Sequence, residues 1–324
     1  MSAWQSFTQR LGIHYPVICG AMYPCGNPEL VAAVSEAGGL GIIQPLSLTY
    51  VYGYEFRVGL DYIQSLTQKP VGMNVLIEAS SEVYLERMRK YVDIALEHGI
   101  RIFVTALGNP EWVVKKVHAA GGIVLHDVTE RKWAEKAIAA GVDGLICVNG
   151  NAGGHAGTIT PEALYNSLKD LGVPLVCAGG VGDEKTFRRM LDLGYAAVQM
   201  GTRFIATEEC KASSEYKQAI LDAEASDIVL TEKLTGVPVA VINTPYVQRI
   251  GTHAGPVARF FLKHRKFKHW MRLFYQIKSV YGFKQTIVKG KGYDDYLQAG
   301  KSVAGIERVE KAASIVERFG SAAF

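Results

Sequence analysis

The chain has little of what would mark a secreted, metal-binding or membrane protein. Its five cysteines, Cys19, Cys25, Cys147, Cys177 and Cys210, are odd in number and scattered, with no Cys-x-x-Cys pair and no Cys/His ligand spacing. No run of about 18 apolar residues occurs, and the first ten residues hold no apolar core of a signal peptide. These absences argue against a disulfide scaffold, a metal site and a membrane partner. We expect reduced core thiols in a cytoplasmic protein.

Acidic residues are missing from one long stretch. Residues 233–293 hold 12 of the 35 basic residues and none of the 31 acidic ones, although the net charge of the chain is only +4. Within it, residues 257–285 interleave basic and aromatic side chains at helical spacing. The aromatic residues could simply pack on the rest of the protein, or the basic face could attract an anionic substrate or an acidic carrier protein. Such a run is not a recognised nucleic-acid-binding fold, so we expect no nucleic acid partner.

The first 210 residues alternate short apolar runs with amphipathic stretches, most of which end at a glycine. Strands are expected at 17–20, 41–43, 71–75, 102–105, 123–126, 144–148, 175–178 and 197–200. Helices are expected near 28–37, 59–67, 82–97, 110–120, 130–140, 161–171 and 183–193. Eight such units over about 200 residues predict an α/β fold, a (β/α)8 TIM barrel. A doubly wound sheet is the alternative, disfavoured because no Gly-x-Gly-x-x-Gly follows the first strand.

After the eighth strand the alternation stops. A helix is expected at 214–223, short β-like pieces at 228–244, a long helix at 257–281 and a closing helix at 302–319. The sequence therefore predicts a barrel over 1–210, a mainly helical cap or insertion over 211–300, and a C-terminal helix within 301–324 that returns to the barrel.

A glycine-rich loop follows the sixth expected strand. Residues 149–157 read Asn-Gly-Asn-Ala-Gly-Gly-His-Ala-Gly, and His155 is the only titratable side chain among them. Glycines let a backbone approach a ligand closely, and an imidazole suits proton transfer near neutral pH. An ordinary turn with a hydrogen-bonded histidine is the plainer alternative. We favour a ligand-binding loop because it stands at the C-terminal end of a strand, where barrel active sites lie.

Two further loops have the composition of a phosphate site. Gly179 and Gly180 follow the seventh strand, and Gly201 and Thr202 follow the eighth, each loop just before a helix. Free backbone amides at a helix start favour a phosphate, and these two loops are its usual place in such barrels. The glycines could instead only form tight turns. At the same end, the small Gly20-Ala21-Met22 stretch and the amide of Asn74 could line a heterocycle, although a buried Asn can also be satisfied by backbone.

These motifs together resemble the nitronate monooxygenase family, formerly called 2-nitropropane dioxygenases, which are FMN-dependent (β/α)8 enzymes. The likeness is densest in Gly20-Ala-Met22, Glu36-Ala-Gly-Gly-Leu-Gly41, Val71-Gly-Met-Asn74, Ala152-Gly-Gly-His-Ala-Gly157, Ala178-Gly-Gly180 and Gln199-Met-Gly-Thr-Arg-Phe204. FMN-dependent NADH:quinone reductases and enoyl-acyl-carrier-protein reductases are similar in the same motifs.

The resemblance implies the site and the reaction. His155 matches the catalytic histidine, and the implied FMN contacts are Gly20, Ala21, Met22, Asn74, Asp127, Gly154, Ala178, Gly179, Gly180, Gln199, Met200, Gly201 and Thr202. Implied substrates are alkyl nitronates or nitroalkanes with O2, in a possible homodimer. The reductases are the alternative activity, and a noncatalytic flavin-binding protein is the alternative outside enzymes. Departures from the family pattern, at residues 148–151 and at His126-Asp127, concern the substrate more than the flavin.

Overall fold

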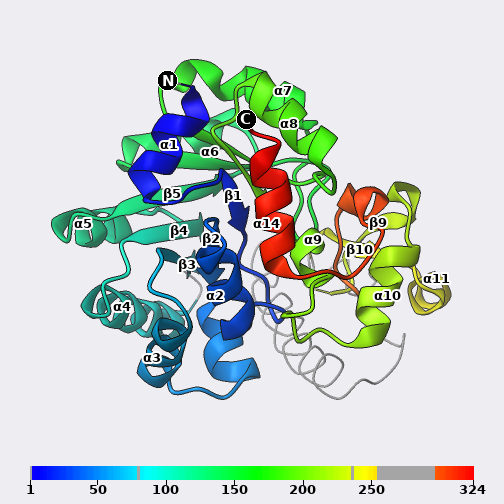
Figure 1. Ribbon diagram of the computed structural model, residues 1–324, viewed down its shortest axis with the longest axis horizontal. Helices are drawn as coiled ribbons and strands as arrows, with labels where there is room; N and C mark the ends of the chain where they lie inside the picture. The colour runs from blue at the N-terminus through cyan, green and yellow to red at the C-terminus, as the bar shows by residue number, and fades with distance from the viewer. Residues whose placement is uncertain (1, 79–80, 235–236, 254–295) are drawn as a thin grey trace.

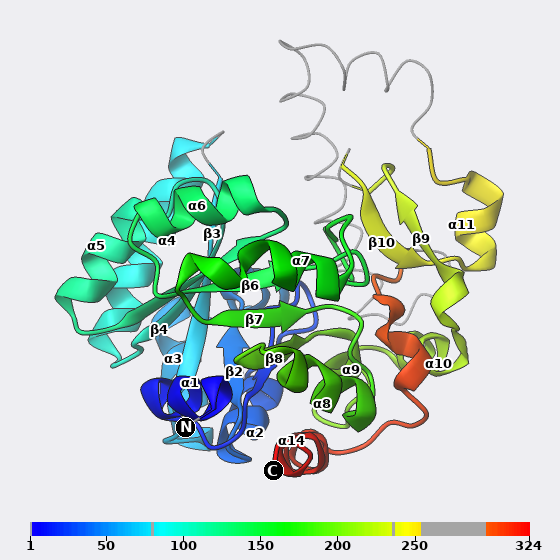
Figure 2. The ribbon, with the colours of Figure 1, turned by 90° about the horizontal axis from the view of Figure 1, so that it is seen from above.

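Eight parallel strands close into a barrel in the computed structural model, which describes residues 2–78, 81–234, 237–253 and 296–324 (Figures 1 and 2). The strands are β1 Val17–Cys19, β2 Leu40–Ile43, β3 Val71–Ile77, β4 Ile102–Leu107, β5 Ile123–Val128, β6 Gly144–Val148, β7 Leu175–Ala178 and β8 Ala197–Met200. Because β1 pairs with both β2 and β8, the sheet has no edge. The predicted TIM barrel is confirmed, and the doubly wound alternative is wrong.

A helix follows each of the first seven strands, as predicted. These helices are α2 Pro28–Glu36, α3 Phe56–Leu66, α4 Glu82–Glu97, α5 Glu111–Ala119, α6 Arg131–Ala139, α7 Pro161–Leu168 and α8 Glu184–Leu193. Most boundaries lie within a few residues of the prediction, and at the start of α3 the helix begins at Phe56 and not at Gly59. The Glu55 side chain accepts a hydrogen bond from the Val58 amide at 3.1 Å and so caps the helix earlier.

The helix α1, Ala3–Leu11, is absent from the sequence-based prediction. Its Phe7 and Leu11 pack with the barrel-interior residues Ile18 and Leu40, so α1 closes the N-terminal end of the barrel. The signal was in the sequence, since Ser2 and Gln5 form a capping box at the helix start.

The insertion after β8 gathers on one side of the barrel (Figures 1 and 2). Its described elements are α9 Thr202–Ile205, α10 Ser214–Asp222, the 3-10 turn η3 Ala225–Asp227, β9 Ile228–Thr231, β10 Val239–Ile242 and α11 Pro245–Ile250. The short β-like pieces expected at 228–244 are β9 and β10, which form an antiparallel pair. The helix predicted over 257–281 lies outside the described residues. The division of the chain at residues 210 and 300 stays a prediction.

The C-terminal segment differs from the single helix predicted over 302–319. It forms a 3-10 turn, η4 Lys301–Gly305, and then a separate helix, α14 Ala312–Ser321. Between them the chain is held by tertiary contacts, because the Glu208 amide donates to the Glu310 carbonyl at 3.1 Å. Helix α14 packs against α2 and α8, where the eighth helix of a barrel would lie (Figure 1).

The described residues show buried thiols, no cluster of metal ligands and no membrane-spanning helix. All five cysteines are buried and unpaired, as expected for core thiols. Within the described ranges, no group of three or more His, Cys, Asp or Glu side chains is arranged to hold a metal ion. No helix in these ranges is long and apolar enough to cross a membrane.

Candidate functional site

Polar side chains line the inside of the barrel at the C-terminal ends of the strands. Residues paired across parallel strands face the same side of the sheet. Asn74 pairs with Val104, which belongs to the barrel interior. Asp127 lies two positions after the interior residue Leu125 and therefore faces the same way. Gln199 pairs with Ile18 on β1 and Ala178 on β7, both interior residues. The structure thus brings four of the predicted contacts, Asn74, Asp127, Ala178 and Gln199, together at the C-terminal mouth of the barrel.

Two polar atoms at this mouth lack a partner. Asp127 Oδ1 and Gln199 Oε1 are buried and have no hydrogen bond within the described part of the chain. Such atoms are costly unless a ligand satisfies them. Burial also raises the pKa of the Asp127 carboxyl from 3.8 to about 7, so near neutral pH a large share of it can donate a hydrogen bond. A heterocycle with both N–H and carbonyl groups, such as the flavin ring, fits this donor and acceptor set.

Gly20-Ala21-Met22 borders the same mouth. A Cβ added to Gly20 would lie 2.9 Å from the Gln199 side chain, so glycine is needed for Gln199 to lie across β1. The Gly20 amide donates to the Met200 carbonyl at 3.0 Å, and the Ser47 hydroxyl donates to the Met22 carbonyl at 3.1 Å. The β1 and β8 loops are therefore fixed to each other.

Gln44, which follows β2, was missed as a candidate. It lies two positions after the interior residue Ile42 and is buried. Its Oε1 accepts a hydrogen bond from the Leu46 amide at 3.3 Å. A polar residue directly after an apolar strand was the available signal.

Asn149 organises the loops after β6 and β7. It is fully buried, and its Nδ2 donates to the Gly179 carbonyl at 3.0 Å while its Oδ1 accepts from the Asn151 amide at 2.9 Å. Its backbone carbonyl accepts from the amides of Ala152 and Gly157. From the sequence, Asn149 counted only as a departure from the family pattern. The structure makes it the residue that shapes the histidine loop.

The glycines after β7 are required by packing against that loop. Gly179 and Gly180 have positive φ angles of 115° and 81°. A Cβ on Gly179 would lie 2.5 Å from the Ala152 amide nitrogen, and one on Gly180 would lie 2.7 Å from Asn151 Cβ. The two glycines therefore do form the tight turn of the plainer alternative. Because neither has a side chain, the β7 loop does not cover its own backbone at these positions.

The β8 loop has backbone amides without a partner inside helix α9, but the Thr202 hydroxyl already accepts a hydrogen bond. Thr202 is the first residue of α9, and the first amides of a helix have no partner within it. Its Oγ1 accepts a hydrogen bond from the Gly300 amide at 3.0 Å. One predicted phosphate ligand thus also anchors the C-terminal segment. Gly201 stays open, because a Cβ there would only touch Met22 Sδ at 3.4 Å.

Residues 296–305, here called the C-terminal strap, run across these loops and were missed as part of the site. The Lys301 amide donates to the Asn151 carbonyl at 2.9 Å. A Cβ on Gly153 would lie 2.9 Å from the Gly300 nitrogen, and a Cβ on Gly154 would lie 3.3 Å from Gln298 Oε1. The Gly154 carbonyl is occupied, since it accepts from the Ala240 amide of β10 at 2.8 Å. The histidine loop is therefore held between the strap and β10.

His155 lies in that loop with an exposed side chain. The surrounding protein nevertheless lowers the pKa of its imidazole by desolvation. This shift favours the neutral form of the ring, which can accept a proton.

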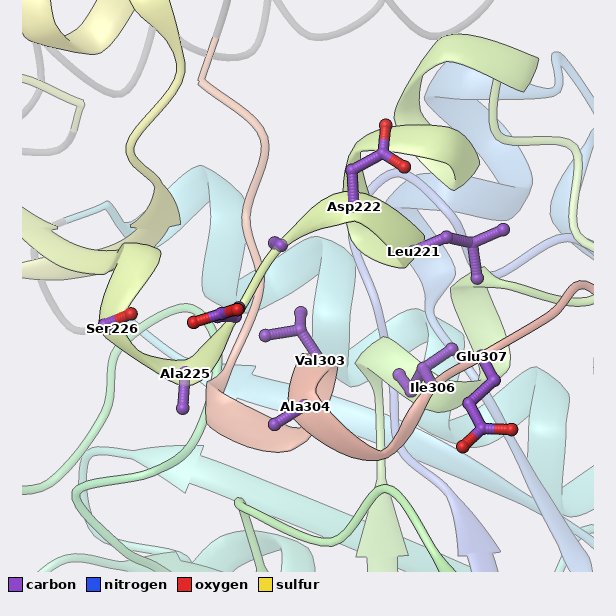
Figure 3. A pocket seen from close by; sticks show the side chains of 10 residues that line it. Leu221, Asp222, Ala225, Ser226, Val303, Ala304, Ile306 and Glu307 are labelled. Carbon is purple, nitrogen blue, oxygen red and sulfur yellow. The ribbon is translucent and has the colours of Figure 1, made fainter.

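A separate groove lies between α10, η3 and the end of the strap (Figure 3). Leu221, Val303 and Ile306 line it together with the acidic side chains of Asp222 and Glu307. None of the predicted site residues borders this groove. We therefore assign it no part in holding the cofactor.

Comparisons with known proteins relate this chain to one family of enzymes. The family model "Nitronate monooxygenase" matches residues 5–319. The chain is 31% identical over 251 residues, 77% of its length and 68% of the relative's, to "(3aS,4S,5R,7aS)-5-hydroxy-7a-methyl-1-oxo-octahydro-1H-indene-4-carboxyl-CoA dehydrogenase" of Rhodococcus jostii. It is 26% identical to a "Probable nitronate monooxygenase" of Staphylococcus saprophyticus over 289 residues, covering 76% of this chain and 80% of that one.

Among solved structures, FabK from Thermotoga maritima is similar over 98% of this chain and 95% of its own, with 26% identity and a TM-score of 0.79. Since the family model covers nearly the whole chain and the site lies where barrel enzymes carry theirs, this chain belongs to the nitronate monooxygenase family and is a flavin-dependent oxidoreductase.

Proposed function

We propose that the protein binds FMN and oxidises alkyl nitronates or nitroalkanes with O2. The observation that carries the proposal is that His155 lies on a loop at the same barrel end as the unsatisfied Asp127 and Gln199. A base beside a flavin suits a substrate whose carbon carries an acidic proton. The family match supports the same activity.

In this proposal the barrel end holds the cofactor in two parts. Asn74, Asp127 and Gln199 would hydrogen-bond the ring system, beside the wall formed by Gly20, Ala21 and Met22. The phosphate end would lie against the β7 and β8 loops, with Gly154 from the histidine loop nearby. That group of contacts comprises Ala178, Gly179, Gly180, Met200, Gly201 and Thr202. When bound, the flavin supplies the redox chemistry, and the chain supplies binding and orientation.

His155 would do the acid–base work. Its neutral ring nitrogen can take the proton from the carbon that bears a nitro group, and the resulting imidazolium can hold the negative charge of the nitronate. A nitronate supplied directly has no such proton to lose. The histidine then contributes only by hydrogen bonding, so the two substrates should depend on it to different degrees.

An oxidoreductase acting on an acyl thioester is the second candidate. The relative from Rhodococcus jostii, at 31% identity, is named as a dehydrogenase of a CoA thioester. The same barrel end could present a thioester's acyl group to the flavin. NAD(P)H would then be an expected electron donor in the reductase direction.

Steady-state assays separate the two candidates. We expect O2 consumption and nitrite release with the nitronate of 2-nitropropane, and slow NADH oxidation with a quinone or an enoyl thioester. Rapid NADH-dependent reduction of an enoyl thioester, with no nitrite from any nitronate, would favour the second candidate. Heat release of the cofactor and chromatography should give FMN, and recovery of FAD would contradict the cofactor assignment.

A further inference from the structure

Among the residues that the structure describes, the backbone of Asn151 has hydrogen-bond partners, whereas its side-chain carboxamide has none. Its amide donates to Asn149 Oδ1 at 2.9 Å, and its carbonyl accepts from the Lys301 amide at 2.9 Å. The backbone of Asn151 is thus fixed from both sides. The carboxamide is left as the one polar group of the residue that these contacts do not use.

The Asn151 side chain covers Gly180. A Cβ built on Gly180 would lie 2.7 Å from Asn151 Cβ and 3.0 Å from its Nδ2. The Asn151 carboxamide therefore lies directly over the β7 loop, within reach of a ligand bound by that loop. Among residues 2–78, 81–234, 237–253 and 296–324, no side chain or backbone group forms a hydrogen bond with the carboxamide.

The β7 and β8 loops next to this carboxamide carry no available basic side chain of their own. Residues 178–183 and 201–202 contain no Lys or Arg. The next residue, Arg203, is 2% exposed, and its Nη2 donates to the Ala206 and Arg308 carbonyls at 2.9 and 2.8 Å. Glu310 lies 3.5 Å from its Nη1. The β7 and β8 loops themselves therefore offer an anion only neutral donors, and a carboxylate at position 151 would repel it.

We propose that Asn151 is a further cofactor-binding residue, whose Nδ2 donates a hydrogen bond to the phosphate monoester of the flavin nucleotide. This inference rests on the proposed FMN and adds a side-chain donor to the backbone amides of the β7 and β8 loops. A carboxamide can donate to phosphate without carrying charge itself, and a hydrogen bond to an ionised acceptor is stronger than one between neutral groups. The strap contributes indirectly, because Lys301 fixes the carbonyl of the same residue.

The test compares two ligands that differ only in the phosphate. Flavin-free protein is titrated with FMN and with riboflavin, following the quenching of flavin fluorescence. In Asn151→Asp, FMN affinity should fall by about tenfold to a hundredfold, because a hydrogen bond to a charged group is lost and a like charge is introduced. Riboflavin affinity should stay within about twofold of wild type, because riboflavin has no phosphate for the new carboxylate to repel. Asn151→Ala should show a smaller loss for FMN alone.

A charge added far from the site serves as the control. Asn166→Asp adds the same charge at an exposed position on α7 and should leave both affinities unchanged. An unchanged ratio of FMN to riboflavin affinity in both Asn151 variants would overturn the inference while leaving the proposed cofactor intact. Equal losses for both ligands would also overturn it, since they would make Asn151 a residue that only shapes the loop. A wild-type protein with no preference for FMN would remove the proposed cofactor and this inference together.

Discussion

Replacing Asn149 by alanine should destabilise the protein and loosen the flavin site at the same time. The side chain is fully buried and links the histidine loop to the β7 loop. The Asn149→Ala change removes its hydrogen bonds to the Gly179 carbonyl and the Asn151 amide, and also its weak contact with Cys177 Sγ at 3.7 Å. Two backbone groups lose their partners, and the smaller side chain leaves a void.

The magnitude follows from those two groups. A buried polar group left without a partner costs about 1–3 kcal/mol. Both bonds are only partly buried, so water can replace part of each. We therefore expect a loss of about 2–4 kcal/mol in the free energy of unfolding, with the void included. Asn149→Asp keeps the acceptor for Asn151 but turns an oxygen of a buried carboxyl group toward the Gly179 carbonyl, so it should cost at least as much.

Urea denaturation of the flavin-free proteins measures this loss, and a flavin titration of each variant measures its effect on the site. Asn166→Ala serves as the control, because Asn166 is exposed on α7. Unfolding free energies for Asn149→Ala within about 0.5 kcal/mol of wild type, the range of ordinary surface changes, would refute the assigned role of Asn149.

Three other predictions concern separate parts of the site. His155→Asn should keep its flavin and lose about a hundredfold to ten-thousandfold in kcat/KM on neutral nitroalkanes, with a smaller loss on nitronates; equal rates for variant and wild type on both would make His155 structural. Burial raises the pKa of Asp127 from 3.8 to about 7, so the flavin-free protein should lose stability as pH rises from about 4 to about 7. The Asp127→Asn variant should not show the part of this loss that comes from Asp127. Stability curves that run parallel for the variant and the wild type would contradict the raised pKa. Gly182→Ala would drive a methyl group into the Ser302 carbonyl of the strap, so it should lower the free energy of unfolding by about 1–3 kcal/mol and weaken flavin binding. An unchanged melting temperature and flavin affinity would show that the strap can move away at no cost.

The barrel could be predicted because each strand is a short apolar run between glycine-ended helices. Orientation could not, since strands of a parallel barrel are buried on both faces and show no alternation. That Gln199 and Asp127 face inward, with unsatisfied oxygens, became visible only from the pairing with Ile18 and the position after Leu125.

The loops after β6, β7 and β8 were located from the sequence, but the contacts that hold them were not. Gly300 and Lys301 reach Thr202 and Asn151 across about a hundred or more residues of chain, and no local pattern encodes such a contact. The predicted helix over 302–319 failed for the same reason, because the contacts of Gly305 and Glu310 override helical propensity there. Helix α1 was encoded locally by Ser2 and Gln5 and could have been predicted.

Anaerobic mixing tests the central claim most directly. The purified protein is mixed without oxygen with the nitronate of 2-nitropropane and, in a separate experiment, with NADH, while the visible absorbance of the flavin is followed. We expect bleaching by the nitronate within the time of one turnover and recovery of the yellow colour when O2 is admitted, with NADH much slower. Rapid bleaching by NADH with no response to the nitronate would contradict the proposed activity and favour the reductase.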